Sequence, residues 1–93
     1  MKLPANYRKL TPRERRRVRE EYILKQDGKC HHCGAPLFGL PSTKVLKMSV
    51  TTDLYPPNFF KHPIHLHHNH DTGMTIGAVH AHCNAVLWEH HDE

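Results

Sequence analysis

The chain has 93 residues with a formal net charge of +4, and 38% of its residues are hydrophobic. A chain of this length forms one domain with a modest core, so a bound metal is expected to add the stability that the core lacks. Its three cysteines cannot all pair with one another, no apolar secretion segment leads the chain, and no stretch is long and apolar enough for a membrane span. These features argue against a disulfide scaffold and a membrane protein, and we expect a reducing, cytoplasmic compartment.

Basic residues are concentrated in the first third of the chain. Residues 1–29 contain ten Lys and Arg against four Asp and Glu, whereas residues 30–93 contain three against five. We therefore distinguish an N-terminal basic segment, residues 1–29, from a core of residues 30–93 within a single domain. Because phosphates that are neutralised by Lys and Arg release counterions, the basic segment predicts a polyanionic partner, with nucleic acid as the first choice.

One helix is predicted in the basic segment. Thr11-Pro12-Arg13-Glu14 forms a capping box with proline at the first helical position, and good helix formers continue from Arg13 to about Lys25, after which Asp27-Gly28 should end the helix. Val18 and Tyr22 lie on one side, so the helix can pack on the domain while its arginines face outward. The side chains that we expect to contact phosphate are Arg13, Arg16, Arg17 and Arg19. A solvated charged face is the alternative.

The middle of the chain is predicted to be a loop with one strand. Proline and glycine interrupt residues 34–62, and only residues 44–52 favour an extended conformation, because of Val45 and Val50. Phe59 and Phe60 are expected to anchor this segment in the core, with exposure to a partner as the alternative.

A small α+β arrangement is predicted for the last third of the chain. Alternation in its first strand predicts that Ile64 and Leu66 face inward while His65 and His67 share the other face. The expected elements are a strand over residues 63–67, a turn at Asp71-Thr72-Gly73, an extended chain over residues 74–79 and a short helix over residues 84–90. With the basic helix in front, these elements define the expected fold class.

A closed metal site is predicted from two similar spacings. Cys30-x-x-Cys33 places two thiolates within reach of one ion, and His80-x-x-Cys83 repeats this spacing with an imidazole in place of one thiolate. Three cysteines and one histidine form a tetrahedral zinc site, which would tie the end of the basic helix to the start of the last helix. His82 is the alternative fourth ligand, although it lacks the matching spacing.

An open metal site is predicted around His67, His68 and Asn84. Adjacent residues at the end of a strand can point to opposite sides, so one imidazole can bind a divalent cation while its neighbour stays free as a base. Asn84 follows the zinc ligand Cys83 and can supply an amide oxygen to the same cation. A site with few protein ligands leaves coordination positions for water and phosphate oxygens, as catalysis requires. An ordinary surface cluster of histidines is the alternative.

Two stretches have the order and spacing of the motifs of a nuclease family. One is Cys30-His31-His32-Cys33, and the other runs from Leu66 through Gly73 and Gly77 to His80-Ala81-His82-Cys83-Asn84. Together they resemble the HNH endonucleases, specifically the phage recombination endonuclease VII group, over residues 30–33 and 64–88. The resemblance implies a ββα-metal fold in a bacterial or phage-infected cell.

Carried over residue by residue, the resemblance implies a role for each motif position. His67 and Asn84 become ligands of a catalytic Mg²⁺, Mn²⁺ or other divalent cation, His68 the general base, and His70 an auxiliary active-site histidine. The two cysteine-containing pairs become a structural Zn²⁺ site. The chain differs from the family at His80, where a cysteine is usual, and at Ile76, where relatives often carry an arginine.

The implied activity is hydrolysis of DNA phosphodiester bonds by one metal ion with a histidine base. The alternative is a non-catalytic, zinc-stapled DNA-binding module, which shares the zinc site and the charge but does not need His68 and Asn84. Little chain follows the last helix in place of the long dimerisation region of the endonuclease VII group, so a monomer and a homodimer are both compatible with the sequence.

Overall fold

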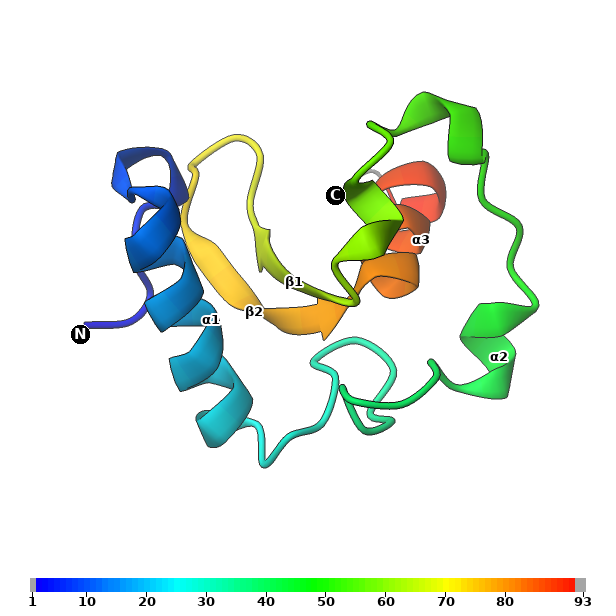
Figure 1. Ribbon diagram of the computed structural model, residues 1–93, viewed down its shortest axis with the longest axis horizontal. Coiled ribbons are helices and arrows are strands. Elements are labelled where there is room, and N and C mark those ends of the chain that lie inside the picture. Colours follow the sequence, from blue (N-terminus) through cyan, green and yellow to red (C-terminus); the bar gives the residue numbers. More distant parts are fainter. Residues whose placement is uncertain (1, 92–93) are drawn as a thin grey trace.

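A two-stranded antiparallel sheet lies between a long N-terminal helix and a C-terminal helix (Figure 1). The computed structural model describes residues 2–91, without the side chain of residue 91. Three α-helices and two strands occur in this part of the chain, together with three single 3₁₀ turns, at Tyr7–Lys9, Thr52–Leu54 and Phe59–Lys61. The α-helices and strands are α1 (Pro12–Lys25), α2 (Thr43–Leu46), β1 (Ile64–His68), β2 (Thr75–His80) and α3 (Ala81–His91).

Helix α1 has the ends that the sequence predicts. The Thr11 hydroxyl accepts a hydrogen bond from the backbone N–H of Glu14, the Glu14 carboxylate accepts one from the backbone N–H of Thr11, and proline occupies the first turn. After the helix, Asp27 and Gly28 have φ angles of 55° and 71°, a left-handed conformation that ends the helical path. Val18 is fully buried against the rest of the domain. The predicted helix and its buried side are therefore confirmed.

Strands β1 and β2 pair in an irregular register. Ile64 pairs with His80 and His67 pairs with Gly77, but His68 pairs with Thr75, so that one residue of β2 is passed over. Such a bulge re-aims the side chains beside it. The connection is a tight turn in which the side-chain oxygen of Asn69 accepts hydrogen bonds from two backbone N–H groups. The predicted strand–turn–strand order is confirmed.

Helix α3 begins directly after β2. Its first residue is Ala81, three positions before the predicted start at residue 84, and the backbone N–H of Ala81 donates to the carbonyl of Pro63. This early start places Cys83 and Asn84 in the first turn of the helix rather than in a loop. Both side chains are therefore held by regular backbone structure.

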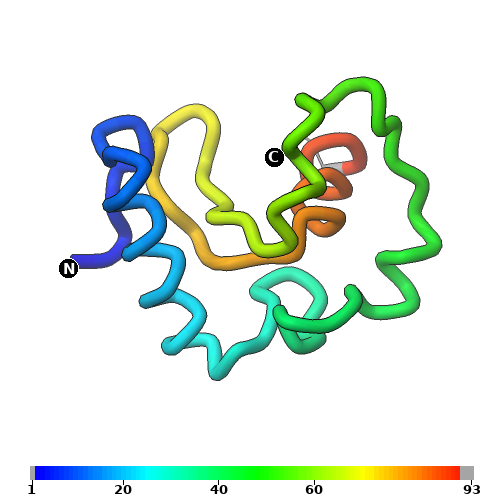
Figure 2. The backbone as a smooth tube through the Cα atoms, viewed as in Figure 1, coloured from blue at the N-terminus to red at the C-terminus, as the bar shows by residue number. Residues whose placement is uncertain are grey.

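The predicted strand at residues 44–52 is wrong. The segment contains α2 and a 3₁₀ turn, and Figure 2 shows it as an arc on the side of α3 that is remote from α1. Val45, 5% exposed, enters the core from a helical turn. Burial of this side chain outweighs its preference for a strand, since such preferences mainly reflect how a residue packs.

The expected burial of Phe59 and Phe60 in the core is also wrong. Phe60 is 38% exposed, and neither phenylalanine belongs to the buried cluster. Both instead contact Tyr55 on the surface near α3; the ring centroid of Tyr55 lies 4.4 Å from that of Phe59 and 5.5 Å from that of Phe60.

The core lies between α1, the sheet and α3, and its buried members are Val18, Tyr22, Cys30, Leu37, Val45, Leu66, Ala78, Val79, Cys83 and Val86. No helix in the described part of the chain combines the length and apolar character needed to cross a bilayer.

Candidate active site and metal centre

The four side chains predicted to bind zinc come together in one cluster. The ligand atoms of Cys30, Cys33, His80 and Cys83 all lie within 4.8 Å of one another. Two of these residues come from the loop after α1, one from the end of β2 and one from the first turn of α3. Their donor set of three sulfurs and one imidazole nitrogen matches tetrahedral zinc. The group could therefore hold a zinc ion.

Hydrogen bonds around His80 orient it as a metal ligand. Its Nε2 lies 2.9 Å from the carbonyl oxygen of Pro36, and because a carbonyl can only accept, Nε2 carries the proton. With the donor at Nε2, a lone pair of Nδ1 can face a metal, and Nδ1 lies 3.5 Å from Sγ of Cys33 and 3.6 Å from Sγ of Cys83. A backbone carbonyl that fixes the tautomer in this way is typical of zinc-binding histidines.

The alternative ligand, His82, is directed elsewhere. Its Nε2 lies 3.1 Å from the carbonyl oxygen of Val45, and it is not part of the four-residue cluster.

Hydrogen bonds within the cluster favour a thiolate at Cys30. The hydrogen bond from the Cys83 thiol is the largest of the causes that lower the pKa of Cys30, to about 4, and backbone N–H groups add to it. The same hydrogen bond between the two sulfur atoms, together with burial, raises the pKa of Cys83. One thiolate is thus already stabilised by the fold, as zinc coordination requires.

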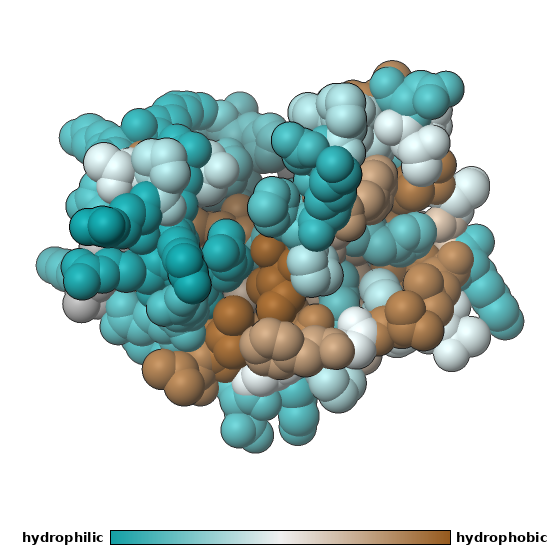
Figure 3. Space-filling view, viewed as in Figure 1, coloured by the Kyte–Doolittle hydropathy of each residue, from teal (hydrophilic) through white to brown (hydrophobic). Residues whose placement is uncertain are grey.

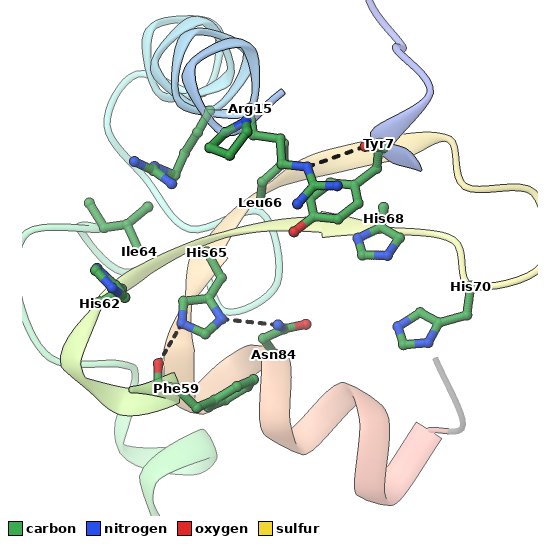
Figure 4. A pocket seen from close by; sticks show the side chains of 12 residues that line it. Tyr7, Arg15, Phe59, His62, Ile64, His65, Leu66, His68, His70 and Asn84 are labelled. Atoms are coloured by element: carbon green, nitrogen blue, oxygen red, sulfur yellow. Dashed lines mark hydrogen bonds between the residues drawn. The ribbon is translucent and has the colours of Figure 1, made fainter. Parts of the chain in front are cut away.

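An open cleft of about 480 Å³ lies along β1, on the side away from β2 (Figure 4). Three successive β1 residues, Ile64, His65 and Leu66, line it, and because successive residues face opposite sides of a strand, the cleft must extend around the unpaired edge of β1. The remaining lining residues come from the N-terminal segment, α1, the loop before β1, the end of β1, the turn and α3; they are Tyr7, Pro12, Arg15, Arg19, Phe59, His62, His68, His70 and Asn84.

His68 is held in a stack of parallel rings. The ring of Tyr7 lies 3.9 Å from it at an interplanar angle of 8°, and the ring of His70 lies 5.1 Å away at 10°. Burial, followed by the electrostatic interaction with the neighbouring His70, lowers the pKa of His68 below its ordinary value. A histidine with a lowered pKa is neutral at neutral pH, and so can accept a proton.

The N-terminal segment places Tyr7 against His68. The backbone N–H of Tyr7 donates to the carbonyl of Gly73 over 2.7 Å, and the guanidinium of Arg8 donates to the carbonyl of His70. The guanidinium of Arg15 lies 4.0 Å from the centre of the Tyr7 ring and its Nε donates to the Tyr7 carbonyl. Tyr7 is therefore fixed from several directions.

His65 and Asn84 form the second organised feature of the cleft. His65 Nε2 lies 2.8 Å from the carbonyl oxygen of Phe59, so this nitrogen donates and Nδ1 is left as an acceptor. Nδ1 accepts from the side-chain amide of Asn84 over 3.1 Å. The amide oxygen of Asn84 therefore points away from His65, toward the side of the cleft where His70 lies (Figure 4). Burial also lowers the pKa of His65, which favours the neutral ring.

The predicted active-site residues are only partly brought together. His68, His70 and Asn84 line the same cleft. His67 does not line it; its side chain is only 3% exposed. The structure thus assembles the predicted base, the auxiliary histidine and one predicted ligand, and it places the other predicted ligand in the interior.

The four arginines predicted to contact phosphate are dispersed. Arg19 lines the cleft together with Arg15, which was not among the four. Arg16 pairs with Glu20 over 3.2 Å, and Arg17 lines a separate hollow beside two acidic residues. Arg13 is exposed and lines neither of these cavities. Figure 3 shows mostly hydrophilic surface over the α1 side of the molecule.

Among the cleft residues that were not predicted as site residues, Tyr7, Arg15 and His65 make the contacts that organise it. The alternation read from the sequence puts His65 on the same face as His67, but only His65 lines the cleft, so this pattern did not identify it. Tyr7 and Arg15 carried no signal in the sequence, because they reach the cleft from a segment far from His68 along the chain.

Comparison of the chain with protein-family models, with curated proteins and with solved structures finds no significant match. Function is therefore inferred from the site.

Proposed function

We propose that the protein is a metal-dependent DNA endonuclease with an HNH-type ββα-metal core, similar to the phage recombination endonuclease VII group. One observation carries the proposal: a strand, turn, strand and helix bring His68, His70 and Asn84 into one cleft, beside the arginines of α1. The four-residue cluster that could hold zinc lies at the β2–α3 junction and would stabilise this unit.

Asn84 is the cation ligand best supported by geometry. Its amide nitrogen is committed to His65, which leaves its oxygen directed into the cleft, and amide oxygens suit hard divalent cations such as Mg²⁺. His67 is the other ligand that the resemblance implies, although it is buried and does not line the cleft. A bound divalent cation would supply charge stabilisation for the phosphorane-like transition state and the departing oxygen.

His68 is assigned as the general base. Its neutral ring takes a proton from a water molecule, the resulting hydroxide attacks phosphorus in line, the bond from phosphorus to the sugar 3′ oxygen breaks, and the departing oxygen takes a proton from solvent. This sequence leaves 5′-phosphate and 3′-hydroxyl ends, as in the family that the motifs resemble. Stacking between Tyr7 and His70 holds the base in one orientation during the transfer.

Arg15 and Arg19 give the cleft affinity for the DNA backbone. Both line it from α1, whereas Arg16 is engaged in an ion pair with Glu20. Positive side chains on one wall attract phosphate and hold it beside the base.

A plasmid cleavage assay with His68→Ala tests the proposal. We expect the parent protein, loaded with zinc, to cut DNA when Mg²⁺ or Mn²⁺ is added, and we expect His68→Ala to cut about 10²–10⁴-fold more slowly, because that is the usual contribution of a general base. His62→Ala serves as the matched control, since it removes another histidine from the cleft without touching the stack.

Further measurements on the same proteins decide the outcome. Zinc content and far-UV circular dichroism should be unchanged in both variants. Cleavage by His68→Ala at the parent rate would remove His68 from the mechanism. If the protein binds DNA but does not cut it with any divalent cation, the endonuclease proposal is wrong and the protein is a zinc-stapled DNA-binding module.

A further inference from the structure

A second, smaller hollow opens beside the cleft. It has a volume of about 170 Å³ and is lined by Leu54, Tyr55, Phe59, His70, Asn84 and Trp88. Phe59, His70 and Asn84 also line the larger cleft, so the two cavities adjoin. The smaller one differs in character, because the rings of Tyr55, Phe59 and Trp88 form much of its wall.

The aromatic wall is held in place rather than loosely attached. The Tyr55 hydroxyl donates to the Glu89 carboxylate over 2.8 Å, and it lies 3.3 Å from the carbonyl of Ala85 on α3. The Glu89 carboxylate also accepts from the backbone N–H of Thr51, which fastens the loop to the helix. Trp88 meets Tyr55 at a steep angle, with ring centroids 5.7 Å apart, and remains 45% exposed. Part of its surface is thus available to a ligand.

We propose that this hollow is a subsite for one unpaired nucleobase next to the phosphodiester in the cleft. The proposal rests on the proposed function and names its substrate class: single-stranded DNA, or DNA with unpaired bases at the cutting point. A nucleotide joins an anionic phosphate to a flat aromatic base, which matches a basic cleft joined to an aromatic hollow. Stacking on aromatic side chains is how proteins commonly bind unpaired bases.

The size and position of the hollow select this occupant. At about 170 Å³ it falls below the roughly 300–1,000 Å³ of pockets for larger ligands, so it suits a single ring system. A base within a duplex is stacked between its neighbours and must leave the helix to enter such a pocket. Asn84 and His70 border both cavities, so a base in the hollow places its own backbone at the proposed reaction centre.

Trp88 provides a direct reporter because it is the one tryptophan of the chain. The zinc-loaded protein is titrated, without added divalent cation, with a short oligothymidylate, with an abasic strand of equal length and with a blunt duplex. We expect the oligothymidylate to quench Trp88 fluorescence and to bind about 5- to 150-fold more tightly than the abasic strand, the range for one stacked base. Equal affinity of the two strands would overturn the proposal.

Variants locate the effect. Leu54→Ala retains the reporter and should weaken binding of the oligothymidylate but not of the abasic strand, and Trp88→Ala, followed by fluorescence anisotropy of labelled DNA, should do the same. Phe38→Ala is the matched control, since Phe38 is 81% exposed and lies outside the hollow. A loss as large in Phe38→Ala as in Trp88→Ala would also overturn the subsite.

Cleavage separates this proposal from the proposed function. In an active enzyme, Trp88→Ala should raise KM for single-stranded DNA more than it lowers kcat, and the preference over duplex should shrink. Base-dependent quenching in a protein that never cuts DNA would support the subsite and refute the nuclease. Cleavage with no base-dependent binding would support the nuclease and refute the subsite.

Discussion

The side chain of Asn84 donates a hydrogen bond to Nδ1 of His65, with 3.1 Å between the two nitrogens. His65 in turn donates from Nε2 to the carbonyl of Phe59. Because a neutral imidazole that donates from one nitrogen must accept at the other, this chain of bonds decides which end of the Asn84 amide faces the cleft. A loop, a strand and a helix thereby cooperate to present one oxygen atom.

Removing His65 should therefore weaken binding of the catalytic cation. In His65→Ala the Asn84 amide is free to turn, and we expect a loss of about 10- to 100-fold in Mn²⁺ affinity, the usual cost of deleting a residue that orients a metal ligand. Isothermal titration of zinc-loaded protein with Mn²⁺ measures this without any cleavage step. His62→Ala should bind Mn²⁺ like the parent; parent-like affinity in His65→Ala would show that the hydrogen bond does not orient a ligand.

Tyr7 should matter through its ring and not through its hydroxyl. Tyr7→Phe keeps the stack on His68, whereas Tyr7→Ala removes it, so we expect cleavage to fall about two- to twelve-fold only in Tyr7→Ala, from the roughly 0.5–1.5 kcal/mol of a stacked pair. The measurement is kcat, with the proton resonances of the His68 ring as a second probe of its environment. A comparable fall in Tyr7→Phe would assign the effect to the hydroxyl.

Loss of zinc should unfold the protein. Structural zinc contributes about 10–16 kcal/mol in zinc-finger peptides, which is comparable with or larger than the roughly 5–15 kcal/mol stability of a whole domain. We expect Cys33→Ser to bind no zinc and to lose the helical signal in its far-UV circular dichroism spectrum. His82→Ala should keep one zinc per chain, because His82 is next to Cys83 but outside the cluster. A folded, zinc-free Cys33→Ser protein would refute the structural role.

The arginines of α1 should differ in their effect on DNA affinity. Arg19 lines the cleft and Arg17 lines a separate hollow, so Arg19→Gln should weaken binding more than Arg17→Gln. A variant that neutralises one phosphate fewer should show a shallower plot of log affinity against log salt concentration, with the magnitude of the slope smaller by about 0.7 for single strands or 0.9 for duplex. Equal effects of the two variants would indicate a diffuse charged face, the alternative left open by the sequence.

Local patterns determined several features of this protein. The capping box at Thr11 and Glu14 predicts where α1 begins, because its hydrogen bonds join residues only three apart. The repeated spacing of Cys30-x-x-Cys33 and His80-x-x-Cys83 predicts the four-residue cluster, because ligand spacing reflects the reach of side chains around one ion. The capping signal and each half of the cluster depend on residues at most three positions apart, so the sequence displays them directly.

Only the tertiary structure decided which residues line the cleft. The ring of Tyr7, near the N-terminus, stacks on that of His68, and Asn84 on α3 forms a hydrogen bond with His65 on β1. His68 lies in the cleft and His67 in the interior, although both belong to one histidine run, and the register of the sheet shifts between them. Residue spacing cannot determine these positions, since they result from how distant segments share one small core.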